Sequence, residues 1–281
     1  MRVLGKMANA ATRGLRKPAF WRGVISIPAF LRFWEFGARS QEWFGVAFPW
    51  VSQVPAPTAV TGEMWRLLQD PSFWYSAYLS TMRVFEGFFA AMVIGIPLGL
   101  TMAVSRTFYG ITFPVFEVLR PIPPLAWVPA AIIFWPTQEL SIAFVTFLGA
   151  FFTIVINVIG GAQAIDIRYF QAARSMGSST WDIFRRIILP GTLPSIVVGA
   201  TVGMGITWAV VVAAEMISGG GSAGSMGGAG GGLGFFIWNS YVGGSYTQIV
   251  VGMISIGIAG YISSAALRKI GELITPWLSD G

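Results

Sequence analysis

The chain has 281 residues and a formal net charge of +6; 54% of its residues are hydrophobic and only 11% are charged. An ordinary soluble domain carries about 25% charged residues, so this composition indicates a protein of the lipid bilayer. The sequence contains no cysteine and no histidine, which excludes disulfides, thiol or histidine catalysis, and zinc sites built on these ligands.

The positive charge is concentrated before the first apolar segment. Arginine and lysine occur repeatedly in the first 22 residues, and the first acidic residue is Glu35. Basic flanks of this kind stay on the cytoplasmic side of a membrane. Residues 1–18 are therefore predicted to be a cytoplasmic basic segment, and nucleic acid is not expected as a partner.

The first apolar segment, residues 19–38, is the weakest predicted span because it contains Arg32 and Glu35. These residues are three positions apart, so on a helix they share a face and are expected to pair. Residues 39–80 are mixed, aromatic and proline-containing, and they are predicted to form an external connection.

A second span is predicted over residues 82–104, with Arg83 and Glu86 as a pair near its outer end. The third is expected to be a broken element over residues 111–135, because "LRPIPPLAWVP" clusters prolines that a straight helix cannot contain. A helix beginning at Pro124 would be about 20 Å long, too short for a hydrocarbon core of about 30 Å. We expect its irregular backbone to be buried in protein or to line a cavity.

Three further spans are predicted over residues 140–160, 193–217 and 248–267. Six spans place both chain ends on one side, and the basic residues in the connections assign that side to the cytoplasm. The predicted fold is an all-α polytopic membrane protein with about six transmembrane helices.

The connection between the fourth and fifth spans, residues 166–190, is longer than a simple link requires. Its pattern predicts an amphipathic helix over 168–175 and a break at Gly177, where a positive φ lets two helices meet at an angle. A second helix is predicted over 179–188, with a stop at Leu189–Pro190. Such a loop suits docking to a cytoplasmic protein; the alternative is an amphipathic helix lying on the lipid surface.

Part of this connection, "QAARSMGSSTWDIFRRIILP", resembles the signature cytoplasmic loop of bacterial ABC importer permeases. In that signature Glu-Ala-Ala is followed by three residues, a glycine, nine residues and Ile-x-Leu-Pro. Gln171 stands where the family usually has Glu, which removes one charge from the docking face. "LRPIPPLAWVP" and "VVAAEMI" resemble the nitrate, sulfonate and taurine branch of these permeases.

The resemblance implies that residues 19–281 form one transmembrane permease domain in a bacterial inner (plasma) membrane. The implied partners are a second permease copy in a homodimer, an ATP-binding subunit docked on the cytoplasmic coupling-helix loop, and an external substrate-binding protein. The chain itself is then not an enzyme and carries no cofactor. The residues assigned to ATPase coupling are Gln171, Ala172, Ala173, Gly177, Trp181, Arg185, Leu189 and Pro190.

The implied substrate is a small anion such as nitrate, taurine or another sulfonate, or bicarbonate. A secondary transporter or channel that works without an ATPase is the alternative. That alternative expects ionisable residues inside several spans, and the sequence offers mainly Glu215.

Four residues are candidates for the pathway or its gate. Glu215 lies near the outer end of an apolar span, where it needs a partner or water, and it is expected to serve a structural or gating role. Asn157 is expected to form an interhelical hydrogen bond. Pro123 and Pro124 belong to the broken element.

The glycine run "GGGSAGSMGGAGGGLGFF", residues 219–236, lacks the lysine that a phosphate-binding loop requires. It is predicted to lie in an external loop, residues 218–234. Residues 219–230 are either a flexible linker or a docking element for the binding protein. The end of the run, "GGLGFFIW", is expected to form a short apolar helix near the outer gate.

Overall fold

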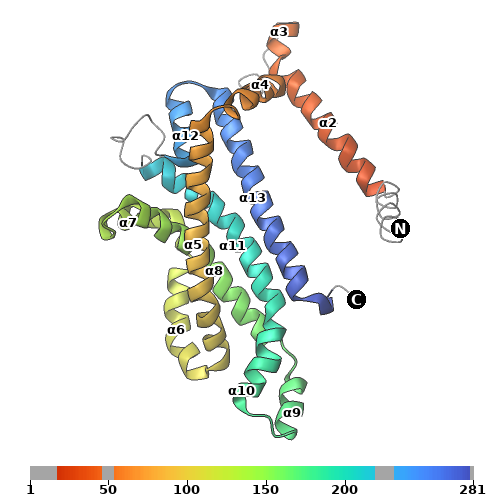
Figure 1. Ribbon diagram of the computed structural model, residues 1–281, viewed down its shortest axis with the longest axis vertical. Coiled ribbons are helices and arrows are strands. Elements are labelled where there is room, and N and C mark those ends of the chain that lie inside the picture. Colours follow the sequence, from red (N-terminus) through yellow and green to blue (C-terminus); the bar gives the residue numbers. More distant parts are fainter. Residues whose placement is uncertain (1–17, 46–53, 219–230, 279–281) are drawn as a thin grey trace. The chain divides into compact units, whose positions relative to one another are not determined.

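The computed structural model describes residues 18–45, 54–218 and 231–278, and every regular element within these ranges is helical (Figure 1). The chain divides into two units. The first comprises residues 1–69 and 244–251, and the second comprises residues 70–243 and 252–281.

In the first unit, α2 (Pro18–Ala38) is followed by α3 (Ser40–Phe44) and α4 (Pro57–Leu67). Thr58 donates its backbone N–H and its hydroxyl to the Glu35 carboxylate, at 3.1 and 2.8 Å. Arg39 Nε lies 2.6 Å from the same carboxylate. The predicted pairing of Glu35 with Arg32 is therefore wrong, because Arg39 and the first turn of α4 occupy both carboxylate oxygens.

The core of the second unit lies between α5 (Pro71–Val104), α8 (Gln138–Gln163) and α11 (Leu189–Ser218), which pack side by side (Figure 1). Small residues set their separation: a Cβ added at Gly87 of α5 would lie 2.7 Å from Thr146 Cβ of α8. Lipid tails are as apolar as the protein core, so the hydrophobic effect does not drive membrane helices together. Their association depends on van der Waals packing, which small residues such as glycine make possible by letting the backbones approach closely. The buried side chains of this core include Val84, Phe88, Ile142, Ile154 and Met204.

The proline-rich element is broken, as predicted. It consists of α6 (Arg106–Leu119), a 3₁₀ turn η1 (Pro124–Trp127) and α7 (Val128–Phe134), and its two parts are bent by 87°. Pro124 opens η1, a position where a missing N–H costs nothing. The Pro123 carbonyl accepts from Ala126 N at 2.9 Å.

Two helices follow the glycine run. The predicted short apolar helix is present as α12 (Gly232–Val242), while residues 219–230 and residues 1–17 of the predicted basic segment 1–18 lie outside the described ranges. From residue 252 onward, α13 (Tyr246–Ile274) packs on α11, with Trp208 Nε1 donating to Ser263 Oγ at 3.0 Å. A last 3₁₀ turn, η3 (Pro276–Leu278), follows.

The predicted helix stop at Leu189–Pro190 is wrong. After α9 (Ile167–Ser175), the chain forms α10 (Thr180–Ile183) and a π-helical turn, η2 (Phe184–Ile188), which leads directly into α11. The result is one helix of 39 residues that ends at Ser218. A proline ring clashes with the preceding turn of a regular α-helix, and the wider π turn in front of Pro190 accommodates it.

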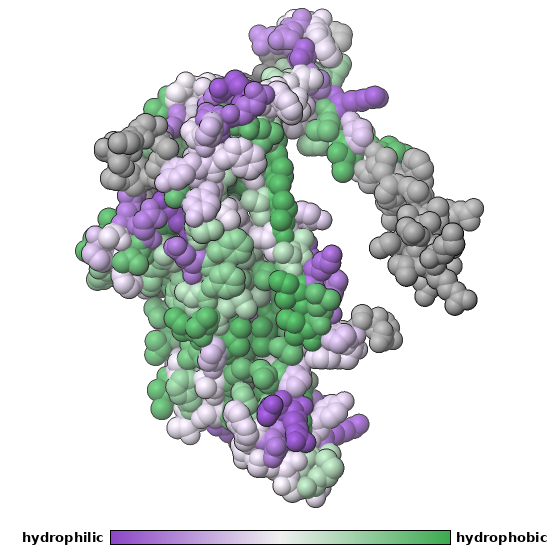
Figure 2. Space-filling view, viewed as in Figure 1, coloured by the Kyte–Doolittle hydropathy of each residue, from purple (hydrophilic) through white to green (hydrophobic). Residues whose placement is uncertain are grey.

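Among the described residues, four helices are long and apolar enough to cross a membrane, or five if α6 and η1–α7 count as one bent span. α2 is not among them, because its 21 residues include Arg22, Arg32 and Glu35. The fold is an all-α polytopic membrane protein, and the predicted count of six spans is not reproduced. Figure 2 shows hydrophobic surface over the middle of the second unit and hydrophilic surface at the end that carries α9 and α10.

Candidate functional site

The loop between α8 and α11 is a helix–glycine–helix structure whose turn is held by its own backbone. Gly177 has φ +74°, Ser178 N donates to Ala173 O at 3.0 Å, and Gly177 N donates to Arg174 O at 3.0 Å. These two bonds form a Schellman motif, which satisfies the last carbonyls of α9 and requires a left-handed residue at the glycine. A Cβ at Gly177 would meet no atom within 4 Å, so backbone conformation alone demands the glycine.

Both helices of this loop are also capped at their N-termini. Asp166 accepts from Arg168 N at 2.8 Å at the start of α9. Ser179 and Asp182 form a reciprocal capping box at the start of α10, with Asp182 N donating to Ser179 Oγ at 3.2 Å. Caps at three of the four helix ends give this exposed loop one defined shape.

Large apolar side chains of the loop are exposed. The exposed fraction is 78% for Met176, 66% for Trp181 and 64% for Tyr169. Trp181 stacks on Phe184, with ring centroids 5.5 Å apart. Exposed apolar groups on a rigid frame are typical of a protein interaction site.

The predicted coupling residues divide into two groups. Gln171, Ala172, Gly177, Trp181 and Arg185 are exposed on the loop, whereas Ala173 is buried and Leu189 and Pro190 are partly buried where α11 begins. The first group is available to a partner, and the second attaches the loop to the helical core.

A second site is a buried cluster of charges that joins α5, α8, α11 and the start of α12. Arg83 is 2% exposed and Glu215 is fully buried. Arg83 NH1 lies 2.8 Å from Glu215 Oε1, and Arg83 NH2 and Nε lie 2.6 and 2.8 Å from the two Glu139 oxygens. The predicted Arg83–Glu86 pair is therefore wrong, because the guanidinium turns inward to two carboxylates that are distant in the sequence.

Glu215 is the most completely bonded member of this cluster. Ser80 Oγ lies 2.8 Å from each of its oxygens, and Gly234 N donates to Oε2 at 2.9 Å. Leu233 N in turn donates to Ser80 Oγ at 2.8 Å. A carboxylate at the N-terminus of α12 is in a favourable field, which helps to offset the cost of burying it.

Two glycines allow α12 to approach this carboxylate. Gly232 has φ +78°, and a Cβ there would lie 2.3 Å from Glu215 Oε1. A Cβ at Gly234 would lie 2.2 Å from Val212 O. The last glycines of the run are thus needed for close contact between α12 and α11.

Sequence reasoning singled out Glu215 but missed the role of Glu139. The available signal was the number of donors on arginine: a guanidinium has five N–H groups, so Arg83 beside one acid still offers donors for a second carboxylate. Asn157 does not bond between helices as expected: its amide donates to Thr153 O of α8 itself, at 2.8 Å. Pro123 and Pro124 contribute no side-chain polar group to either site.

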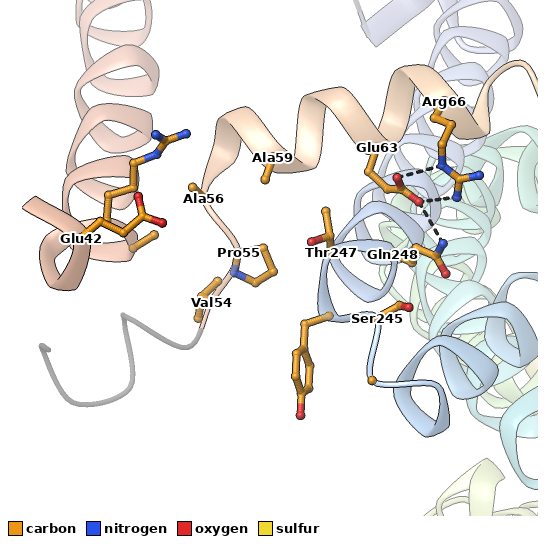
Figure 3. Close-up of a pocket in the computed structure, with 14 residues that line it drawn as sticks. Glu42, Val54, Pro55, Ala56, Ala59, Glu63, Arg66, Ser245, Thr247 and Gln248 are labelled. Carbon is orange, nitrogen blue, oxygen red and sulfur yellow. Dashed lines mark hydrogen bonds and ion pairs between the residues drawn. The ribbon is translucent and has the colours of Figure 1, made fainter.

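The first unit contains a separate polar pocket of about 700 Å³, shown in Figure 3. α4 contributes Glu63, which accepts from Arg66 Nε and from Gln248 Nε2, each at 2.9 Å. The bond from Arg66 holds the pKa of Glu63 below its ordinary value. None of the residues predicted to be functional lines this pocket.

Several helices long and apolar enough to cross a membrane, with a capped loop that exposes apolar side chains between α8 and α11, define a polytopic membrane protein. The chain belongs to the family described as binding-protein-dependent transport system inner membrane components, whose model matches residues 95–280. It is therefore a permease subunit of an ABC importer and not an enzyme. Members of this family act with an ATP-binding subunit and a substrate-binding protein.

Similar proteins agree with this assignment. The nitrate import permease protein NrtB of Synechocystis sp. is 34% identical over 268 residues, which cover 92% of this chain and 90% of that protein. The taurine transport system permease protein TauC of Escherichia coli is 31% identical over 208 residues, covering 74% and 72%. Among solved structures, an inward-facing MetNI methionine ABC transporter matches with a TM-score of 0.58 and 24% identity, covering 74% of this chain and 99% of that one, which supports the fold.

Proposed function

We propose that this chain carries a small oxyanion, such as nitrate, taurine or another sulfonate, or bicarbonate, as one of two identical permease subunits. The relatives named for nitrate and for taurine support this substrate class. We place both chain ends and the loop 166–190 in the cytoplasm, because basic residues are concentrated in those segments.

The exposed apolar face of the loop, made of Tyr169, Met176 and Trp181, is the observation that carries the coupling role. An ATP-binding subunit would bury these side chains, with Gln171, Ala172 and Arg185 beside them. Closure of the ATP-binding subunits would push the loop as a unit, because its turn and caps resist deformation. The push would then tilt α11, a rigid-body movement that needs no chemistry on this chain.

Trp181→Ala in a co-purified transporter tests this proposal. Loss of a buried aromatic anchor costs at least about 2 kcal/mol at an interface, so affinity for the ATP-binding subunit should fall by more than about tenfold. Trp65→Ala is a matched control, because Trp65 is 70% exposed but lies on α4, outside the loop. Equal affinities for the two variants would count against docking at this loop.

A second test addresses transport itself. A Gly177→Pro, Leu189→Asp double variant should abolish stimulated ATPase activity and uptake while the helical circular dichroism is retained. The purified chain alone should hydrolyse no ATP. Uptake by the chain alone in liposomes, driven by an ion gradient without ATP, would instead favour a secondary transporter or channel.

A further inference from the structure

The guanidinium of Arg83 binds its two carboxylates unequally. Glu215 is fully buried and is also bonded by Ser80 and by Gly234 N. Glu139 is 57% exposed, and among the described residues its carboxylate bonds to Arg83 alone. One counter-ion is therefore held by several groups of the fold, and the other is an exposed carboxylate that bonds to Arg83 alone among the described residues.

The Nε–NH2 edge of Arg83, which the Glu139 carboxylate covers, is the part suited to a planar oxyanion. Arg83 Nε and NH2 hold the two Glu139 oxygens at 2.8 and 2.6 Å, a bidentate pairing of guanidinium with carboxylate. Nitrate, bicarbonate and sulfonates likewise present two oxygens on one central atom. The Glu139 carboxylate thus occupies the position that such an anion would take.

Charge favours an exchange of these two groups. Arg83 contributes one positive charge, and Glu215 and Glu139 contribute one negative charge each. If Glu139 moves out and a monovalent anion takes its place, the charge of the buried cluster does not change. The N-terminal end of α8, where Glu139 is the second residue, adds a favourable field for either anion.

We propose that the Nε–NH2 edge of Arg83 is an oxyanion-binding subsite of the transport pathway, closed in this structure by the Glu139 carboxylate. Movement of Glu139 opens the subsite, and its return expels the anion. Glu215 keeps Arg83 oriented throughout. This inference rests on the proposed transport of a small oxyanion and adds the residues that meet it inside the permease.

The experiment uses the absence of cysteine from the chain. In the complete transporter, Glu139→Cys places the only thiol of this chain beside the uncovered edge of Arg83. A sulfonate-bearing methanethiosulfonate reagent serves as the probe, and labelling is read on this chain after the subunits are separated. The anionic probe should label the introduced thiol faster than a trimethylammonium analogue by on the order of tenfold, because the arginine attracts it. Sodium nitrate should slow this labelling, and sodium chloride at the same ionic strength should not.

Glu86→Cys is the matched control, because Glu86 is an exposed acid on the same helix as Arg83. At this control position the two reagents should react at similar rates and nitrate should not protect. Equal labelling of the Glu139→Cys variant by both reagents, or labelling of that variant unaffected by nitrate, would overturn the subsite.

A non-covalent measurement tests the same subsite in case the Glu139→Cys variant has a distorted structure. Glu139→Gln keeps the shape of the side chain and removes its charge, so nitrate should raise the thermal midpoint of this variant more than that of the wild type. Identical shifts with nitrate and with chloride in both proteins would also refute the subsite. ATP-dependent uptake by the wild-type transporter is scored separately, so the proposed function can stand even if the subsite fails.

Discussion

Gly232→Ala is the sharpest probe of the contact between α12 and the buried charge cluster. Two penalties add at this position. The left-handed backbone, at φ +78°, costs a residue with a Cβ about 1–2 kcal/mol. The new Cβ would also stand 2.3 Å from Glu215 Oε1 and 2.6 Å from Oε2, an overlap that adds about 1–3 kcal/mol.

Gly244→Ala separates the two penalties. Gly244 has φ +71°, nearly the same as Gly232, but a Cβ there meets no atom within 4 Å. It should therefore cost about 1–2 kcal/mol, and Gly232→Ala about 2–5 kcal/mol. The difference corresponds to a factor of roughly 5 to 150 in the unfolding equilibrium, since about 1.4 kcal/mol is tenfold.

The measurement is reversible unfolding of the purified chain in mixed detergent micelles, followed by far-ultraviolet circular dichroism. A double-mutant cycle strengthens it, because Glu215→Ala removes the atoms that the new Cβ would overlap. In that background Gly232→Ala should cost no more than Gly244→Ala does. Equal destabilisation by the two alanines in the otherwise wild-type chain would refute the close contact of Gly232 with the carboxylate.

Four further outcomes are expected. Gly87→Ala should destabilise the chain by about 1–3 kcal/mol, because its Cβ would stand 2.8 Å from Phe147 N across the α5–α8 contact, and thermal unfolding checks this. Gly177→Ala should lower stimulated ATPase activity and uptake together, whereas Gly177→Asn should lower them less, because Asn tolerates positive φ. Glu215→Gln should cost about 3 kcal/mol or more by breaking the buried pair with Arg83, and unaltered transport would argue against any gating role. Gly205→Pro should kink α11 and uncouple ATP hydrolysis from uptake, whereas Gly205→Ala, with no atom within 4 Å of its Cβ, should leave coupling intact.

Local patterns in the sequence predicted much of the local structure of the loop 166–190 and of the proline-rich element. The helix expected over 168–175 is present as α9, Gly177 has the expected positive φ, and the proline cluster breaks its element. These features depend on residues a few positions apart. One is the glycine of a Schellman motif, and the other is a group of prolines, which lack the backbone N–H that a helix uses as a hydrogen-bond donor. Short-range chemistry of this kind can be recognised without knowing the tertiary fold.

Another element contributes to both mistaken pairings: Thr58 of α4 bonds to Glu35, which also pairs with Arg39, and Glu139 of α8 bonds to Arg83. Arg32 with Glu35 and Arg83 with Glu86 both fit helical spacing, but isolated pairs at that spacing contribute only about 0.2–0.5 kcal/mol. Partners on other elements, such as Glu139 at 56 positions from Arg83, satisfy more hydrogen bonds at once. Sequence spacing does not reveal which distant element supplies them.

The helix stop predicted at Leu189–Pro190 was the error with the largest consequence for mechanism. Because η2 lets the helix continue, a single element of 39 residues runs from Thr180 to Ser218. At 1.5 Å per residue its length is about 58 Å.

Trp181 lies at one end of this element and Glu215 three residues before the other. Because no break separates these two residues, a displacement of one end would be carried to the other more directly than across a break at Pro190. If an ATP-binding subunit docks at the loop 166–190 as proposed, a force applied there acts on the same helix that carries Glu215, the buried partner of Arg83. The loop 166–190 and the buried charge cluster thus share one continuous helix, which would give the proposed ATP-driven movement a direct route to the proposed anion subsite.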